Sequence, residues 1–385
     1  MNKILNIPRA IGRKLKRGAI TFHRSVPKWF YAFPILAGVC AILHAITCLS
    51  VPFADLFSDT VCAAIRFLLA KLTGWIPFSM GELTIILLPF ALLFMIGLSI
   101  WMVGHYKAKL YCRVMAGMLS VIFSLYTLFV LTLAPGYQGF TLDQKMKLDR
   151  EAVSVEELYA TAEILRDKAH AELDAVLFRH GTFSVMPYSL EEMNDKLCDA
   201  YEKVSAKYEF IQNFRSNIKF VMLSEPMSYT HITGVYTFYS GEANLNVNFP
   251  DYSLPYTAAH ELAHQRGIAR EDEANFVAFL ACMESDDPYI RYSGYINLLE
   301  YVMGALNKAD SAKYSSFYGT LDYRIVYEFY AQSNFFEQYR DNVAADVSGA
   351  VNDAYLQVQG QTAGRQSYNL VVDLAVAYYK AHPTE

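Results

Sequence analysis

Three long stretches without a charged side chain constrain the fold of this chain more than any other feature. Residues 29–51, 83–104 and 114–134 contain no Asp, Glu, Lys or Arg. Each stretch is close to the ~20 residues that an α-helix needs to cross a bilayer. Because backbone N–H and C=O groups find no partner in hydrocarbon, such segments cross as helices. The sequence therefore predicts a membrane protein with three N-terminal transmembrane helices.

The N-terminal tail indicates the orientation of these helices. Residues 1–28 contain eight basic side chains and no acidic one, and the loop between the second and third stretches is also basic. Basic segments beside membrane spans stay in the cytoplasm. We therefore expect a basic cytoplasmic tail at 1–28, a transmembrane region at 29–134 and an extracytoplasmic domain at 135–385, anchored in the lipid bilayer of the cell membrane. Topology alone explains the basic tail, so no nucleic-acid partner is expected.

The segment between the first two stretches has a different pattern. In residues 55–75, Arg66 and Lys71 interrupt an otherwise apolar run at helical spacing. This pattern is typical of an amphipathic helix that lies at the membrane interface or packs on a helix bundle. We expect one of these two positions for it.

The C-terminal part is predicted to be a mainly α (α+β) domain with a small sheet. Apolar residues that recur every three or four positions predict helices, and short alternating runs of β-formers predict strands. The expected helices cover residues 141–177, 189–208, 276–283, 292–306, 315–339, 344–359 and 368–381, and the expected strands cover 218–223, 233–239 and 243–248. Residues 235–248 are expected either to form the upper edge of a cleft, where a peptide adds as a strand, or to be an ordinary solvated edge.

Residues 257–267 carry the most specific chemical pattern. His260 and His264 are four positions apart, and a turn of 3.6 residues places them on one face of a helix. Two imidazoles in this arrangement can share a zinc ion, and Glu261 between them can act as a base. Because Glu261 would be an unusual residue to bury without a metal or a partner, we prefer a zinc site to the alternative of two surface histidines.

A third ligand requires that this helix end soon after the second histidine. In one straight helix, a rise of ~1.5 Å per residue would carry Glu271 roughly 16 Å from the first histidine. Gly267 can end the helix with a left-handed cap, and a second helix that begins near Glu271 would then bring a carboxylate back to the metal. Glu271 is therefore the predicted third ligand, and Glu273 and Glu284 are its rivals.

The segment 271–278 resembles the ExxA(D/N)xxA element of several HExxH families, including membrane peptidases that process CAAX proteins. In those families the first glutamate binds zinc, which the resemblance carries to Glu271, and the Asp or Asn supports a ligating histidine, which it carries to Asn275. The seven positions from His264 to Glu271 are fewer than is usual there, so the resemblance covers the site and not the whole fold. Glu242 is expected, with Asn275, to orient the ligands.

A second resemblance covers nearly the full chain. It is carried by the three N-terminal spans and by five short motifs, which are Gly241-Glu242-Ala243, His-Glu-Leu-Ala-His-Gln-Arg-Gly, Glu-Asp-Glu-Ala-Asn-Phe, Tyr292-Ser293-Gly294-Tyr295 and Ser367-Tyr368. These features are similar to a bacterial membrane family catalogued as a domain of unknown function, numbered thirty-eight ten. That family is considered a family of zinc metallopeptidases. The resemblance therefore implies the same topology and a zincin-like domain, but no substrate.

The pattern as a whole predicts a membrane-anchored zinc metallopeptidase that hydrolyses peptide or protein substrates. Glu261 would take a proton from a water activated by Zn²⁺ and pass it to the leaving amine. A Tyr or His commonly helps to stabilise the oxyanion in such enzymes. Tyr292 and Tyr295 are the preferred donors, and His231 is another candidate.

Other classes of protein are compatible with the same residues. One is a membrane protein that binds zinc and senses a peptide or cell-wall component without cutting it. Another is a membrane scaffold with a vestigial site, and a third is a zinc amidase that acts on cell-wall peptides. The intact HExxH with a glutamate nearby favours an enzyme.

Overall fold

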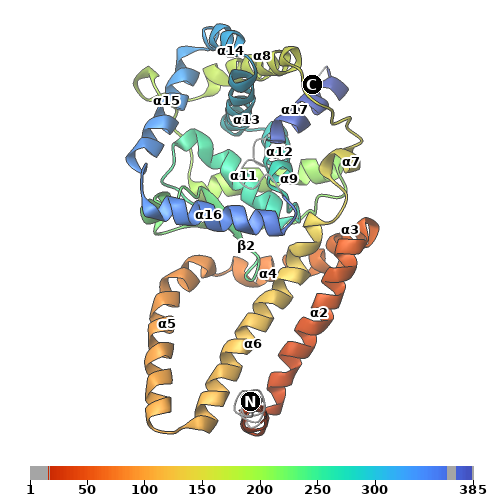
Figure 1. Ribbon diagram of the computed structural model, residues 1–385. Helices are drawn as coiled ribbons and strands as arrows, with labels where there is room; N and C mark the ends of the chain where they lie inside the picture. Colours follow the sequence, from red (N-terminus) through yellow and green to blue (C-terminus); the bar gives the residue numbers. More distant parts are fainter. Residues whose placement is uncertain (1–15, 17, 362–369, 384–385) are drawn as a thin grey trace, which may run out of the picture. The chain divides into compact units, whose positions relative to one another are not determined.

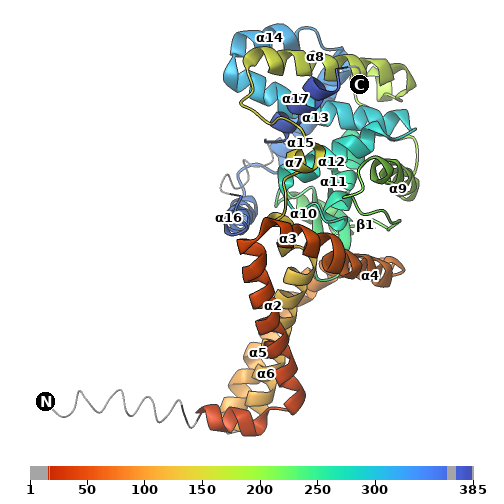
Figure 2. The same ribbon diagram turned by 90° about the vertical axis from the view of Figure 1, so that its right-hand side faces the viewer.

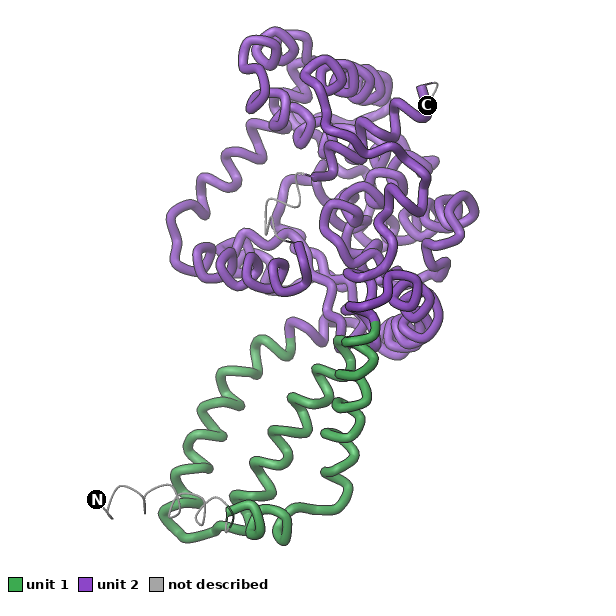
Figure 3. Tube along the Cα trace, turned by 45° about the vertical axis from the view of Figure 1, so that its right-hand side comes forward, with its two compact units in different colours: residues 1–46, 83–130 green, residues 47–82, 131–385 purple. Residues whose placement is uncertain are grey.

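The computed structural model describes residues 16, 18–361 and 370–383. The chain is mostly helical and divides into two compact units. Unit 1 comprises residues 1–46 and 83–130, and unit 2 comprises residues 47–82 and 131–385 (Figure 3). Most of the basic tail and the start of the predicted last helix lie outside the described residues.

Long apolar helices make up unit 1. They are α2 (Ala32–Leu49), which follows the 3-10 turn η1 (Lys28–Tyr31), then α5 (Met80–Gly104) and α6 (Ala108–Thr132). The three candidate spans, Lys28–Leu49, Met80–Gly104 and Ala108–Thr132, have mean hydropathies of 2.1, 2.6 and 2.2. The described part of the chain thus contains three helices that are long and apolar enough to cross a membrane, which confirms this part of the prediction.

The segment between the first two spans belongs to unit 2. It contains α3 (Val51–Phe57), the π-helical turn η2 (Ser58–Cys62) and α4 (Ala63–Gly74). Its contacts are made with the C-terminal part of the chain, because Gln212 Nε2 donates to the Ala63 carbonyl over 2.9 Å and Lys219 Nζ donates to the Thr73 carbonyl over 3.0 Å. Residues 47–82, which the sequence assigned to the transmembrane region, are therefore part of the same compact unit as the C-terminal domain.

A small three-stranded sheet crosses unit 2. Its strands are β1 (Lys219–Phe220), β2 (Gly234–Thr237) and β3 (Glu242–Leu245), in the order β1-β3-β2. β3 is parallel to β1 and antiparallel to β2, with Val235 opposite Asn244. β3 is thus the central strand and β2 lies at an edge.

Asparagines alternate along the predicted third strand, at Asn244, Asn246 and Asn248. Asn244 and Asn246 are buried. The Asn244 amide donates to the Val235 carbonyl over 2.9 Å, and the Asn246 amide donates to the Ile232 carbonyl over 3.1 Å. Beyond Leu245, the last residue of β3, the Asn246 N–H still donates to the Thr233 carbonyl over 2.9 Å.

Helices α11, α12 and α13 lie in the interior of unit 2, and other helices pack around them (Figures 1 and 2). The helices of the C-terminal part are α7 (Leu142–Met146), α8 (Val155–Glu172), α9 (Leu190–Lys207), α10 (Ser224–Ser228), α11 (Leu254–Gln265), α12 (Glu271–Met283), α13 (Pro288–Ala309), α14 (Ser311–Tyr318), α15 (Tyr323–Gln338), α16 (Val343–Val358) and α17 (Val371–Ala381).

The single helix predicted at 315–339 is wrong, because α14 ends at Tyr318 and α15 begins at Tyr323. The side chain of Asp322 accepts a hydrogen bond from the Arg324 N–H over 2.9 Å. This contact caps a new helix at a point where the apolar spacing alone suggested continuity.

Candidate metal centre

Helix α11 carries the two histidines and is buried on almost every side, with Thr257 as its least buried residue. The small side chains of Ala258, Ala259 and Ala263 allow neighbouring elements to approach closely. Pro255 lies in the first turn, and the Ser293 hydroxyl accepts a hydrogen bond from the Tyr256 N–H over 3.1 Å. Packing and hydrogen bonds within the protein therefore hold α11 in place without a metal ion.

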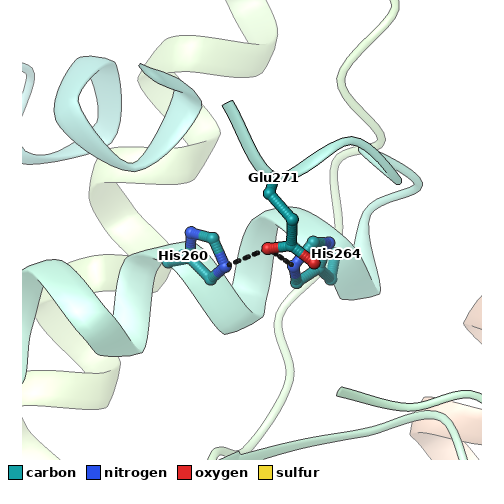
Figure 4. Close-up of side chains that lie close together, drawn as sticks. All are labelled: His260, His264 and Glu271. Carbon is teal, nitrogen blue, oxygen red and sulfur yellow. Dashed lines mark ion pairs between the residues drawn. The ribbon is translucent and has the colours of Figure 1, made fainter. Parts of the chain in front are cut away.

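His260, His264 and Glu271 converge on one point (Figure 4). Glu271 Oε2 lies 3.3 Å from His260 Nε2 and 3.3 Å from His264 Nε2. All three residues are buried, and their potential ligand atoms lie within 4.8 Å of one another. Two of these residues come from α11 and the third is the first residue of α12.

The turn between the two helices has the predicted left-handed glycine. Gly267 has φ +103°. The Ile268 N–H donates to the Ala263 carbonyl over 3.1 Å, and the Gly267 N–H donates to the His264 carbonyl over 3.0 Å. These two bonds form a Schellman motif, which ends a helix through a residue with positive φ. The predicted helix break is confirmed, and it brings Glu271 back to the histidines.

The same turn orients His264. Its Nδ1 lies 2.7 Å from the Ile268 carbonyl oxygen. A carbonyl oxygen can only accept, so Nδ1 carries the proton and the lone pair of the neutral ring is on Nε2. Nε2 is the atom that faces Glu271. A metal-binding histidine is commonly held by such a contact.

From the ExxAN resemblance, Asn275 is expected to support a ligating histidine, and the Asn275 side chain influences the pKa values of both His260 and Tyr301. This side chain favours the protonated form of the His260 ring. It is also hydrogen-bonded to the phenol of Tyr301. Tyr301, Asn275 and His260 therefore form a polar chain that runs from α13 through α12 to α11.

The distances from Glu271 to the two histidines are compatible with one shared metal ion, for which zinc serves as the example. Around a tetrahedral zinc ion, with bonds of about 2.0–2.1 Å, ligand atoms lie about 3.3–3.4 Å apart. This separation matches the two distances of 3.3 Å from Glu271 Oε2 to the imidazole nitrogens. Among the described residues, Glu271 Oε2 makes no hydrogen bond with good direction despite those short distances. Short distances with poor hydrogen-bond direction are expected of atoms that face a common ion.

The electrostatics of the centre favour a cation. Burial alone would raise the pKa of Glu271, but the positive charge of His264 and the contact with His260 hold that pKa well below its usual range. Burial opposes protonation of His264, yet Glu271 raises the pKa of His264 to about 9. Burial lowers the pKa of His260. Glu271 is therefore ionised in the interior opposite a protonated His264, and a metal ion could supply the positive charge in place of that proton.

Glu261 lies beside the cluster and under the edge strand. Burial raises its pKa to about 8, and its Oε2 has no hydrogen-bond partner among the described residues. Gly234, the first residue of β2, covers this side chain so closely that a Cβ there would lie 2.5 Å from Glu261 Oε1 and 2.6 Å from Cγ. The glycine therefore leaves the space that the Glu261 carboxylate occupies.

The two rival glutamates point elsewhere. Glu273 Oε1 accepts hydrogen bonds from the Leu142 N–H over 2.9 Å and from Arg270 Nη1 over 3.0 Å. Glu284 follows the end of α12 and pairs with Lys207. Of the three candidates, Glu271 is the one whose carboxylate lies against both imidazoles.

The predicted tyrosine donors lie in other surroundings. The Tyr292 ring packs against Phe178 and Tyr289. Burial, followed by Glu328, raises the pKa of Tyr292, and the carboxylates of the metal centre are not among the groups that do so. Tyr295 packs against Phe279. The structure thus brings neither tyrosine to the cluster, because the α13 residue that reaches it is Tyr301.

His231 and Glu242 are also engaged elsewhere. His231 Nε2 lies 2.8 Å from the Tyr339 carbonyl oxygen. Glu242 Oε2 accepts hydrogen bonds from the Met80 N–H over 3.0 Å and the Gly81 N–H over 3.2 Å. Glu242 therefore caps the start of α5 instead of orienting a metal ligand, since a carboxylate is favoured at a helix N-terminus.

Three residues of the centre could not be recognised in the sequence. Arg66 is fully buried and contacts Gly267, since a Cβ on that glycine would lie 2.7 Å from the Arg66 Cζ. The negative charge of Glu271 raises the pKa values of Tyr301 and Tyr355, after burial as the main cause. These residues come from α4, α13 and α16, and no local pattern links those segments to the histidines.

The fold and this centre define a class of protein, namely a membrane-associated helical protein with a buried His-His-Glu cluster that could hold a metal. The chain belongs to the family described as Protein of unknown function (DUF3810), whose family model matches residues 57–376. The match confirms the family resemblance drawn from the motifs. Comparison with curated proteins gives no match, and comparison with solved structures gives none either.

Proposed function

We propose that this protein is a membrane-anchored, zinc-dependent metallopeptidase. The observation that carries the proposal is the convergence of His260, His264 and Glu271, with Glu271 3.3 Å from each histidine and the carboxylate of Glu261 buried beside them. Two imidazoles and one carboxylate are the donor set of many hydrolytic zinc sites. Zinc in such a site supplies Lewis acidity and lowers the pKa of water toward about 7.

Each side chain then has a separate role. His260, His264 and Glu271 hold the ion, and the contact between His264 and Ile268 fixes the ring that faces it. The carboxylate of Glu261 takes a proton from the attacking water and delivers it to the leaving amine. Its burial supports this role, because a carboxylate with a raised pKa exchanges protons readily near neutral pH.

The position of β2 as an outer strand of the sheet in the described part of the chain supports an extended peptide as the substrate. The Asn246 N–H donates to the Thr233 carbonyl over 2.9 Å, so these two residues form a hydrogen-bonded pair. Such pairs alternate along an antiparallel ladder, which leaves the backbone groups of Gly234 and Tyr236 directed away from β3. A peptide that adds as a strand to this edge would pass next to Glu261.

The proposal places unit 2 outside the cytoplasm. This placement is supported by the basic residues of the tail at 1–28 and of the loop between α5 and α6, together with three crossings. The peptides cut would then be extracytoplasmic segments of membrane or secreted proteins.

Glu261→Gln tests the proposal most directly. The variant should retain zinc, because the ligands are unchanged, yet should lose cleavage of a mixed peptide library measured by mass spectrometry. His260→Ala should lose zinc, measured by elemental analysis. Glu284→Gln is the matched control, since this carboxylate pairs with Lys207 and lies outside the cluster; it should keep both properties.

The same measurements separate the competing functions. Wild-type protein that holds zinc and cuts no peptide would be a zinc-binding sensor, and protein without bound metal would be a scaffold. Cleavage confined to cell-wall peptides would indicate an amidase. Proteins that accumulate in membranes of cells carrying Glu261→Gln, compared with the parent strain, would identify the substrate.

A further inference from the structure

Helix α4 has two faces of opposite character. Cys62 at its N-terminal end, Arg66 and Ala70 are 0%, 1% and 4% exposed. The other face bears large apolar side chains, namely Phe67, Leu68, Leu72 and Trp75, which are 42%, 54%, 55% and 79% exposed. A soluble helix normally shows its polar face to water. On α4 the outward face is mainly apolar; the exposed charged residue there, Lys71, lies over the Phe67 ring and donates to the Arg215 carbonyl over 2.8 Å.

The inner face is attached to unit 2 by a buried arginine. Arg66 Nη1 donates to the Thr132 carbonyl over 2.9 Å, and Nη2 donates to the Ser58 carbonyl over 3.1 Å. The same guanidinium group contacts Gly267, the glycine that ends the histidine helix. One arginine side chain therefore separates α4 from the turn that leads to Glu271.

Both ends of α4 are also held by residues 212–219. Gln212 binds the Ala63 carbonyl at the first residue of the helix. At the last turn, the Asn217 amide donates to the Gly74 carbonyl over 3.0 Å, and Lys219 Nζ donates to the Thr73 carbonyl over 3.0 Å. Because these contacts fix the rotation of the helix, α4 cannot hide its apolar face by turning.

The position of α4 in the chain indicates what covers that face. Helix α2 ends at Leu49 and α5 begins at Met80, and both are long and apolar enough to cross a membrane. The segment between two successive spans starts and ends at the same membrane surface. Residues 50–79, which include α4, are therefore tethered to that surface at both ends.

A second apolar site lies at the start of α5. Met222 and Leu223 are 81% and 45% exposed. Their backbone N–H groups donate to the carboxylate of Glu82, over 3.1 Å and 2.7 Å. Glu82 is the third residue of α5. These two side chains are thus held at the beginning of a membrane-spanning helix.

We infer that the outer face of α4, together with Met222 and Leu223, lies in the interface of the lipid bilayer. An interfacial helix of this kind buries its apolar face about 5–10 Å into the boundary between headgroups and acyl chains. Tryptophan is favoured at that depth, and Trp75 lies directly after the last residue of α4. The contact fixes unit 2 against the membrane in addition to its covalent anchors.

This contact sets the height of the metal centre. A helix with its side chains is about 10–12 Å across, so the Gly267 turn lies about one helix diameter above the apolar face. If the peptidase function proposed above is correct, on which this step rests, the substrates are polypeptide segments next to the membrane surface. An extended chain of a few residues spans such a height.

Fluorescence of Trp75 tests the inference without any need for activity. The chain has three tryptophans, and replacing Trp29 and Trp101 by Phe leaves Trp75 as the only emitter. The full-length protein is reconstituted in vesicles whose lipids are brominated either near the headgroup end or near the methyl end of the acyl chains. We expect blue-shifted emission and stronger quenching by the headgroup-end bromines.

The control moves the probe to α14, at the opposite end of unit 2 from α4 (Figures 1 and 2). In that variant Trp75 is also replaced by Phe, and the exposed Ser316 becomes the emitter through Ser316→Trp. It should show unquenched emission typical of water. The inference is overturned if Trp75 emits as in water, if it is blue-shifted but unquenched because protein covers it, or if methyl-end bromines quench it most. The fluorescence measurement depends on neither zinc nor cleavage. If it contradicts the membrane contact, the proposed function is still tested independently, by zinc content and peptide cleavage in Glu261→Gln.

Discussion

Substitution of Gly267 by alanine should damage both the stability of unit 2 and its affinity for zinc. This residue has φ +103°, and an L-residue held in a left-handed conformation costs about 1–2 kcal/mol. Its Cβ would also lie 2.7 Å from Arg66 Cζ and closer still to Nη2. The buried guanidinium group must then shift away from Ser58 or Thr132, whose carbonyls it binds.

The size of the effect follows from these two contributions. A hydrogen bond to a charged group contributes about 1.5–3 kcal/mol, so losing one of the two Arg66 bonds brings the total to about 3–5 kcal/mol. At about 2 °C per kcal/mol for a unit of this size, the melting temperature falls by roughly 6–10 °C. Displacing the Ile268 carbonyl from His264 should weaken zinc binding by about 10–100-fold.

The assay compares Gly267→Ala with Gly360→Ala in detergent-solubilised protein. Gly360 also has positive φ, +90°, but a Cβ there meets no atom of the described residues within 4 Å. The control should therefore lose only the backbone contribution, about 2–4 °C, and should bind zinc as the wild type does. Melting is followed by intrinsic fluorescence, and zinc affinity by competition with a chelator. Equal melting temperatures for the two variants, or unchanged zinc affinity in Gly267→Ala, would refute the reasoning.

Two further substitutions test the arrangement of the centre. Glu271→Gln should weaken zinc binding at least about tenfold, whereas Glu273→Gln should keep it, since the carboxylate of Glu273 faces away from the histidines; equal affinities in a chelator titration would overturn the ligand assignment. Gly234→Ala should leave the zinc content unchanged but displace Glu261, with a loss of peptide cleavage of about 10²-fold. Gly304→Ala is its control, because a Cβ there meets nothing within 4 Å in the part of the chain that the structure describes. Full activity in Gly234→Ala would argue against Glu261 as the base.

Local and periodic features of the fold were visible in the sequence. The three apolar helices are long uninterrupted runs, and their chemistry needs no tertiary context. The pairing of His260 with His264 follows from the helical repeat alone. The break at Gly267 follows from the conformational freedom of glycine and from the length of a straight helix. The helical spacing and the helix break are each determined by residues within about two helical turns along the sequence.

Features that depend on distant segments were not visible in this way. Tyr292 and Tyr295 were expected as donors because a Tyr or His commonly assists the oxyanion. The direction in which each residue of α13 points depends on how that helix packs, and Tyr301 is the tyrosine of α13 whose pKa Asn275 influences. Glu242 was expected near the ligands, yet it caps α5 because the sheet meets the start of that helix. The residue types in a motif and their spacing do not determine which distant segments of the chain come into contact in the folded protein.

The sequence by itself determined the apolar spans, the histidine pair and the glycine turn, because short-range geometry dictates all three. Only the tertiary structure decided which carboxylate joins the pair, since Glu271 and Glu273 share one helical turn and differ in the partners around them. It also decided that α4 packs with the metal centre through Arg66, although α4 and that centre are about two hundred residues apart in the chain. The free energy of packing, which sums over contacts between remote segments, makes those choices.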